Sequence, residues 1–176
     1  MTLPDNELWP SFKGNRESFS NLFRCYYPIL FQYGSKFCPD RDVLKDCIQE
    51  LFIDLWQSGP NVEVRSIRAY LLKALKYKIY KHYRDAEKIK TSEVSDDIAF
   101  VVSHENFLIG LQEDRDRTEK VLNAIQQLSN REREIIYLKL YQKLCYDEVV
   151  DVMQINYQAA RNLFYQAIKS LRKMLS

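Results

Sequence analysis

The chain has 176 residues, of which 46% are hydrophobic and 28% charged, and its formal net charge is +2. This length allows one domain or two small ones, with enough apolar side chains to fill their cores. No apolar run approaches the roughly 20 residues of a membrane-spanning helix. The opening stretch MTLPDNELWPSFK has neither the basic nor the apolar part of a signal peptide. We therefore expect a cytoplasmic protein with no membrane contact of its own.

The residues that carry metal or covalent chemistry are scattered. The four cysteines, at 25, 38, 47 and 145, form no C-x-x-C pair, and His82 and His104 are isolated from them. A glycine-rich phosphate loop, a nucleophile elbow and an H-E-x-x-H motif are all absent from the sequence. We expect no metal, no cofactor and no catalytic residue, so a binding function is favoured over an enzyme.

The first expected helices run through Phe19 to Tyr33, where Pro28 predicts a kink or break, and then from Asp40 to Gln57. Leu44, Ile48, Leu51 and Leu55 form the core stripe of the second helix. Away from that stripe lie an isoleucine, acids and amides: Asp46, Gln49, Glu50, Ile53 and Gln57, with Trp56 on the flank. This mixture suggests a docking surface for another protein. A single exposed isoleucine that has no binding role is the alternative.

A third helix, expected from Val64 to Lys88, is strongly basic. Between residues 65 and 90, nine Lys and Arg residues stand against two acids. The periodicity predicts buried positions at Ile67, Tyr70, Leu71 and Ala74, and the opposite side carries cations interleaved with tyrosines. Cations neutralise phosphates and aromatic rings stack on unpaired bases, so this helix suits single-stranded nucleic acid. The alternative is a solvated face whose tyrosines complete the core.

An acidic stretch separates this helix from the rest of the chain. Eight acids and two arginines lie between residues 91 and 119. We predict two all-helical domains, 1–90 and 118–176, joined by a flexible acidic linker over 91–117, in which Phe100 to Gln112 could form a short helix.

The C-terminal block reads as a helix-turn-helix. A helix near Thr118 stops at Ser129-Asn130, either of which can cap the next helix, and REREIIYLKLY follows. Then YDEVVDVMQINYQAARNLFYQAIKSLRKM breaks at Gln154, where Asn156 can cap a helix that starts at Tyr157. Residues on the exposed side of that helix are Tyr157, Gln158, Arg161, Asn162, Tyr165, Lys169 and Arg172.

In helix-turn-helix geometry the start of the second helix enters the major groove. Gln158, Arg161 and Asn162 could then reach base edges, while Lys169 and Arg172 would contact phosphate. The alternative is an ordinary helical hairpin with a polar face.

Two motifs together resemble one family. LKDCIQELFIDLW, from Leu44 to Trp56, is similar to the segment D-x-x-Q-E-x-F-x-x-x-W of the extracytoplasmic-function (ECF) group of bacterial RNA polymerase sigma factors. LSNREREIIYLKLYQKLCYDEVVDVMQINYQAARNLFYQAIKSLR aligns without gaps to the second DNA-binding segment of that group. The resemblance covers nearly the whole chain.

This resemblance implies partners for each surface. Asp46, Gln49, Glu50, Ile53 and Trp56 would dock on the β′ clamp helices of core RNA polymerase. The loop and basic helix would open the minus-ten element and capture a flipped base. The C-terminal domain would read the minus-thirty-five element, with Arg161 at the basic position of the recognition helix, and would meet the β flap. An anti-sigma factor is a further expected partner. The implied minus-ten residues are Asn61, Arg65, Arg68, Lys73, Lys76, Tyr77, Tyr80 and Arg84.

Several positions depart from the family pattern. Gln154 stands where the turn usually has glycine, Val150 where a small residue is usual, and Gln166 where the family has arginine. Tyr77 and Lys81 replace the common Asn and Asp of the basic helix. These changes imply a divergent promoter specificity or weak initiation. Without the polymerase contact, the chain would be a helix-turn-helix regulator of duplex DNA; an RNA-binding adaptor is a third possibility.

Overall fold

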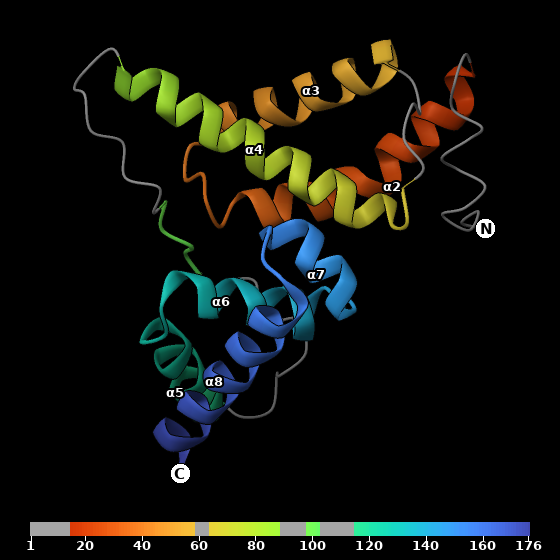
Figure 1. The fold of residues 1–176 in the computed structure, drawn as a ribbon. Helices are drawn as coiled ribbons and strands as arrows, with labels where there is room; N and C mark the ends of the chain where they lie inside the picture. The colour runs from red at the N-terminus through yellow and green to blue at the C-terminus, as the bar shows by residue number, and fades with distance from the viewer. Residues whose placement is uncertain (1–14, 59–63, 89–97, 103–114) are drawn as a thin grey trace. The chain divides into compact units, whose positions relative to one another are not determined.

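The computed structural model of the chain describes residues 15–58, 64–88, 98–102 and 115–176 (Figure 1). It divides the chain into two compact units, Met1–Asp96 and Asp97–Ser176. All the regular structure within the described ranges is helical. The prediction of two small all-α domains is therefore confirmed. Asn61 and most of the short helix expected over Phe100 to Gln112 lie outside the described residues.

Within its described residues, the N-terminal unit contains the helices α2 (Arg16–Gly34), α3 (Arg41–Ser58) and α4 (Ile67–Lys88). Each packs against the other two. Side-chain oxygens satisfy the first backbone amides of each helix: Asn15 Oδ1 accepts from Glu17 N, Asp40 Oδ1 from Asp42 N, and Ser66 Oγ from Ala69 N. Fully buried core side chains are Leu22, Leu30, Leu44, Ile48, Leu71, Leu72, Leu75 and Ile79. Burying each contributes on the order of 1.5–3 kcal/mol.

Pro28 lies inside α2 without ending it, contrary to the break considered from the sequence. An interior proline removes one backbone hydrogen bond and costs roughly 3 kcal/mol. Its own side chain is exposed, while Tyr26, Leu30 and Tyr33 on the opposite side are buried. The burial of these neighbours offsets the lost hydrogen bond, so the helix continues to Gly34.

Gly34, at the end of α2, lies close to side chains of both α3 and α4. A β-carbon at this position would collide with Leu44 Cδ1 and lie 3.1 Å from Leu75 Cδ2. All three positions are fully or almost fully shielded from solvent. A glycine is needed here because the neighbouring helices occupy the space of a side chain.

The buried face of α4 differs in part from the prediction. Ile67 and Leu71 are buried as expected, but Tyr70 and Ala74 are half-buried, and Leu72, Leu75 and Ile79 complete the core. The buried face of the helix is therefore rotated away from Tyr70 and Ala74, toward Leu72, Leu75 and Ile79. A helix that packs against two others needs a wider apolar stripe than one narrow row.

The C-terminal unit contains α5 (Arg115–Gln126), α6 (Asn130–Ile136), α7 (Tyr146–Met153) and α8 (Tyr157–Leu175), and α8 contacts the other three. Ser129 and Glu132 form the capping box of α6, in which Ser129 Oγ accepts from Glu132 N and Glu132 Oε2 accepts from Ser129 N. After α6 the chain forms a π-helical segment, Tyr137–Tyr141, where Gln142 N donates to Tyr137 O. The Tyr137 and Tyr141 rings stack within this segment, with their centroids 5.0 Å apart.

Residues 98–102 belong to this unit, although the sequence placed them in the linker. Phe100 and Val102 are buried, the Phe100 N–H donates to Asn130 Oδ1 at 3.1 Å, and its ring lies 5.8 Å from Tyr137. The described part of this segment is not helical. The compact C-terminal unit therefore extends back to Asp97, because the apolar side chains of Phe100 and Val102 are buried in it.

The turn between α7 and α8 uses a left-handed residue. Gln154 has φ 53° and ψ 47°, and Asn156 then caps α8 by accepting from Ala159 N at 2.7 Å. Glycine adopts this backbone conformation freely, whereas a residue with a β-carbon is strained in it. The sequence departure at this turn therefore keeps the backbone geometry that glycine favours.

Gln154→Gly should stabilise the C-terminal unit by about 0.5–1 kcal/mol, because relief of the left-handed strain exceeds the entropy that glycine adds to the unfolded chain. Calorimetry should show the melting temperature of one transition rising by several degrees. Gln154→Ala keeps the β-carbon and should give no gain. Both tryptophans, Trp9 and Trp56, precede residue 97, so a shift in the tryptophan fluorescence transition would contradict a local effect.

Lys36, which follows α2, has a side chain only 2% exposed, and burial lowers the pKa of its amine to about 8. In the unfolded chain that pKa is near 10.5, so the unfolded state binds more protons between pH 8 and 10.5. The lysine therefore destabilises the fold below pH 8, and this penalty fades as pH rises to 10.5.

Chemical denaturation of Lys36→Met should show a variant that is more stable at pH 7 by on the order of 2–3 kcal/mol. The difference from the parent protein should shrink as pH rises from 8 to 10.5. Lys45→Met, at an exposed position, should show no such trend. A constant difference for Lys36→Met across this range would contradict the pKa assignment.

Candidate nucleic-acid and partner interfaces

The outer face of α3 is a mixture of acids, amides and apolar side chains. Asp46, Gln49 and Glu50 are exposed, and Ile53 and Trp56 are 49% and 41% exposed. The opposite stripe, from Leu44 to Leu55, is buried. The prediction that Ile53 points away from the core is confirmed.

Aromatic rings from α2 support the end of this face. The Trp56 ring lies 4.8 Å from that of Phe19, and the Phe52 ring lies 4.8 Å from that of Phe23. Phe23 itself is 37% exposed. The five predicted residues of α3 thus lie on one helix surface, bordered by an apolar edge from α2 that the sequence did not predict.

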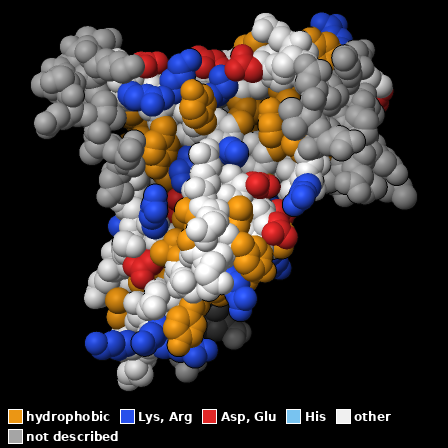
Figure 2. Space-filling view, viewed as in Figure 1, with side chains coloured by type: hydrophobic (Ala, Val, Ile, Leu, Met, Phe, Trp, Pro, Cys, Tyr) orange, Lys and Arg blue, Asp and Glu red, His pale blue; other side chains and the backbone are white. Residues whose placement is uncertain are grey.

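A lysine of α4 pairs with the other edge of the same face. Lys78 Nζ lies 2.7 Å from Asp54 Oδ2 and 3.6 Å from Glu50 Oε2. Figure 2 shows basic and acidic side chains together along the part of the N-terminal unit where α3 and α4 lie. Neither Asp54 nor Lys78 was among the predicted site residues. The i,i+4 spacing of Glu50 and Asp54 was visible in the sequence, but their partner on another helix was not.

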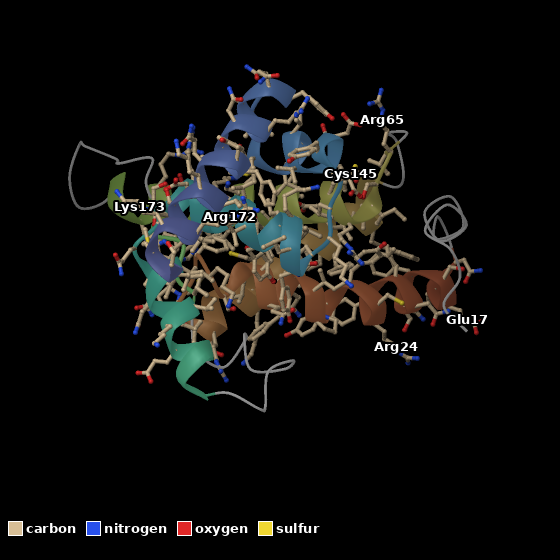
Figure 3. All side chains as sticks on the ribbon, turned by 90° about the horizontal axis from the view of Figure 1, so that it is seen from below. Glu17, Arg24, Arg65, Cys145, Arg172 and Lys173 are labelled. Carbon is tan, nitrogen blue, oxygen red and sulfur yellow. The ribbon has the colours of Figure 1, made fainter. Side chains whose placement is uncertain are left out.

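The basic residues of α4 divide into two groups. One exposed row follows the helix at intervals of three or four residues: Lys73, Tyr77, Lys81 and Arg84. Tyr77 is 59% exposed. Arg65, just before the helix, is also exposed and extends outward (Figure 3). Lys81 was noted only as a family departure, yet it continues this row.

Lys76 and Tyr80 lie elsewhere. Lys76 Nζ lies over the Phe37 ring at 5.3 Å and the Tyr80 ring at 5.8 Å, and both residues are half-buried. A cation held against aromatic rings is less available to phosphate than one in open solvent. Arg68, also half-buried, makes contacts of its own. The seven predicted minus-ten residues that the structure describes therefore do not all lie on one exposed row.

The exposed side of α8 agrees with the sequence in detail. All seven predicted residues, from Tyr157 to Arg172, are exposed, and Tyr165 is 64% exposed. Gln158 Nε2 donates to Asn162 Oδ1 at 2.9 Å, one turn along the helix. Ala160 and Ala167 are buried beneath them. The capped N-terminus of α8 places the positive end of the helix dipole beside Gln158, which favours a nearby phosphate.

Packing between α7 and α8 holds this surface in place. The Tyr146 ring lies 5.7 Å from Tyr157 and 6.3 Å from Phe164, and Lys139 Nζ lies 4.2 Å above the Tyr146 ring.

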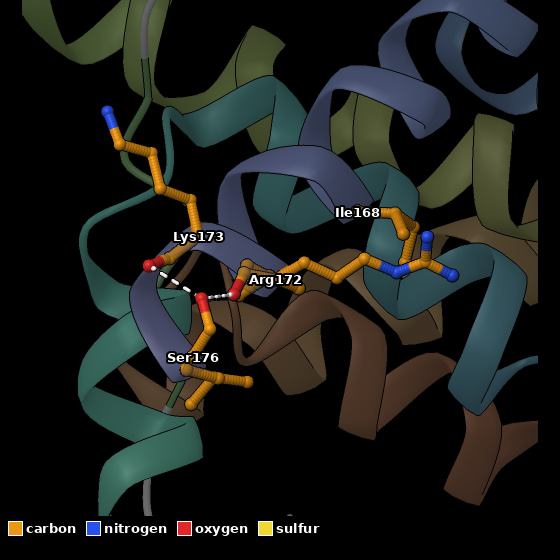
Figure 4. A pocket seen from close by; sticks show the side chains of 6 residues that line it. Ile168, Arg172, Lys173 and Ser176 are labelled. Carbon is orange, nitrogen blue, oxygen red and sulfur yellow. Dashed lines mark hydrogen bonds between the residues drawn. The ribbon is translucent and has the colours of Figure 1, made fainter.

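At the far end of α8, Lys and Arg side chains gather (Figure 2). There Ser176 Oγ donates to Arg172 O at 2.8 Å, and the Arg172 side chain extends along a shallow pocket (Figure 4).

The described residues include no group of three or more His, Cys, Asp or Glu side chains arranged to hold a metal ion. The cysteines are free thiols, and burial raises the pKa of Cys47 to about 11, which disfavours the thiolate that would bind metal or attack a substrate. None of the described helices combines the length and apolarity of a membrane span.

An α-helical unit with an exposed mixed face on α3 and a basic row on α4, followed by a helix-turn-helix unit, is typical of a DNA-binding transcription protein. Residues 22–89 match the model of sigma-70 region 2, and residues 118–171 match that of sigma-70, region 4. The chain therefore belongs to the sigma-70 family, and its pairing of these two regions is that of the ECF sigma factors. It binds core RNA polymerase, recognises promoter DNA and helps to open it. Sigma factors are not themselves enzymes.

Two solved structures share the fold. One is the sigma factor RpoE in complex with the anti-sigma factor NepR from Bartonella quintana, with 16% identity, a TM-score of 0.61, and coverage of 90% of this chain and 97% of that chain. The other is CnrH in complex with the cytosolic domain of CnrY, with 19% identity, a TM-score of 0.57, and coverage of 92% and 90%. A comparison with curated proteins gave no match.

Proposed function

We propose that the outer face of α3 is the surface by which this sigma factor docks on core polymerase. Asp46, Gln49 and Glu50 would pair with cations of the β′ clamp helices, and Ile53 and Trp56 would bury their apolar surface there. The observation that supports this assignment best is the exposure of Ile53 and Trp56 within a ring of acids and amides. A regulator that only binds DNA has no use for such a face.

Along α4, the row from Lys73 to Arg84 is the candidate surface for the opened minus-ten strand. Lys73, Lys81 and Arg84 would neutralise phosphates, while the exposed Tyr77 ring offers a stacking surface for an unpaired base. Arg65 would extend this surface, and Asn61 remains the candidate for the flipped-base pocket. Lys76, Tyr80 and Arg68, which are half-buried and lie outside this row, remain candidates for the minus-ten site.

On α8, Gln158, Arg161 and Asn162 would read base edges of the minus-thirty-five element. Tyr157, Tyr165, Lys169 and Arg172 would contact the backbone. We assign docking and minus-ten recognition to residues 1–90 and minus-thirty-five recognition, with the β flap contact, to residues 118–176. The chain acts in the cytoplasm without catalysing a covalent step. An anti-sigma factor would hold it, as NepR is bound to RpoE.

Run-off transcription with purified core polymerase tests the function directly. Template-specific transcripts are expected, and a chain that binds duplex DNA but never joins core would instead be a regulator.

Glu50→Lys and Gln49→Ala should each weaken core binding, because the first reverses a charge of the docking face and the second removes a hydrogen-bonding amide. Fluorescence anisotropy with labelled sigma factor and core polymerase would measure the affinity. Both variants should bind duplex DNA through α8 as before. Unchanged affinity for core would remove α3 from the interface.

Arg161→Ala should cost roughly 1–3 kcal/mol on the preferred minus-thirty-five sequence and should relax the preference at one position. Binding to a panel of duplexes with single substitutions would measure this. Lys169→Ala is the matched control. It should lose affinity equally for all duplexes, and the slope of log affinity against log salt concentration should fall by about one. A uniform loss for Arg161→Ala would reassign that residue to phosphate.

A further inference from the structure

Lys78 extends from α4 to the α3 docking face and ends between two carboxylates. Its Nζ lies 2.7 Å from Asp54 Oδ2 and 3.6 Å from Glu50 Oε2, so the shorter contact is a charge-assisted hydrogen bond and the longer one a looser ion pair. The Lys78 side chain is 19% exposed, whereas those of Asp54 and Glu50 are 66% and 68% exposed. The cation is thus mostly enclosed and the carboxylates are mostly open.

This asymmetry separates the pair from an ordinary surface ion pair. Lys78 lies next to Ile79 and three residues after Leu75, both fully buried core residues of α4, so its backbone is fixed by the packing of the domain. Glu50 and Asp54 are one turn apart on α3 and repel each other. A fixed cation between them removes that repulsion and restricts their rotamers. Their solvent-facing oxygens remain available to an outside donor.

We propose that Lys78 is a positioning residue of the docking face and that Asp54 is a further contact residue on it. Lys78 holds both carboxylates in one arrangement before binding, so that they meet cationic side chains of core polymerase as a preformed pair. Preorganisation lowers the entropy that each flexible carboxylate would otherwise lose on binding. This inference rests on the proposed docking function of α3.

A purely electrostatic role for Lys78 predicts the opposite sign. If the lysine only neutralised the acids, its removal would make the face more negative and would tighten binding to a cationic partner. If the lysine positions the acids, its removal weakens binding despite the extra negative charge. The direction of the change therefore distinguishes the two roles.

The test uses the full chain and purified core polymerase, with affinity measured at several salt concentrations. Lys78→Met should weaken binding about three- to tenfold, and Lys78→Arg, which keeps the charge, should retain most of the affinity. Asp54→Asn should weaken binding by a similar factor. Lys120→Met is the control for the loss of one positive charge, because Lys120 is exposed on α5 of the C-terminal unit, and it should bind as the parent does.

A double-mutant cycle separates positioning from a loss of fold. In the Lys78→Met background, Asp54→Asn should weaken core binding by less than half of the factor that it causes in the parent. Thermal melting should confirm that each variant is folded at the assay temperature. Tighter or unchanged binding by Lys78→Met, or full additivity in the cycle, overturns the inference. A parent chain that does not bind core, or a Glu50→Lys variant with unchanged affinity for core, would instead contradict the proposed docking function of α3 itself.

Discussion

The close approach of three helices at Gly34 is the constraint on which the N-terminal unit depends. Without a side chain there, Leu44 of α3 and Leu75 of α4 can both reach α2. The three helices then bury one face each, and the outer faces of α3 and α4 are left exposed side by side. The proposed docking face of α3 and the basic row of α4 therefore both depend on the same packing of three helices. Because Lys78 follows Leu75 by less than one turn, the same packing also positions the Lys78 amine beside Glu50 and Asp54.

The C-terminal unit depends on a different constraint, which is backbone geometry. Gln154 accepts a left-handed conformation, and the turn then delivers Asn156 to the start of α8 as a cap. Tyr146 and Phe164 fill the angle between the two helices. Strain at one residue is tolerated because this packing stabilises the turn as a whole. The exposed side of α8, which we propose reads DNA, is thus positioned by packing within the C-terminal unit.

The charges of the chain serve different purposes on the two units. On α3, acids surround exposed apolar side chains, an arrangement that suits a protein partner with cations of its own. On α4 and α8, exposed cations and tyrosines suit phosphates and bases. A net charge of only +2 conceals this separation. Only the distribution along the chain and over the helix faces shows which surface suits which partner.

The sequence by itself determined most of the helices, the capping residue Asn156, the exposed side of α8 and the outward position of Ile53. These features follow from the period of one helix and from contacts between residues a few positions apart. Tertiary structure decided the enclosure of Lys78 between Glu50 and Asp54, the place of Lys76 against Phe37, and the burial of Phe100 against Tyr137. Each of these joins segments that are 24 to 39 residues apart. A helical pattern cannot specify them, because it gives the face of a residue but not which neighbouring element that face meets.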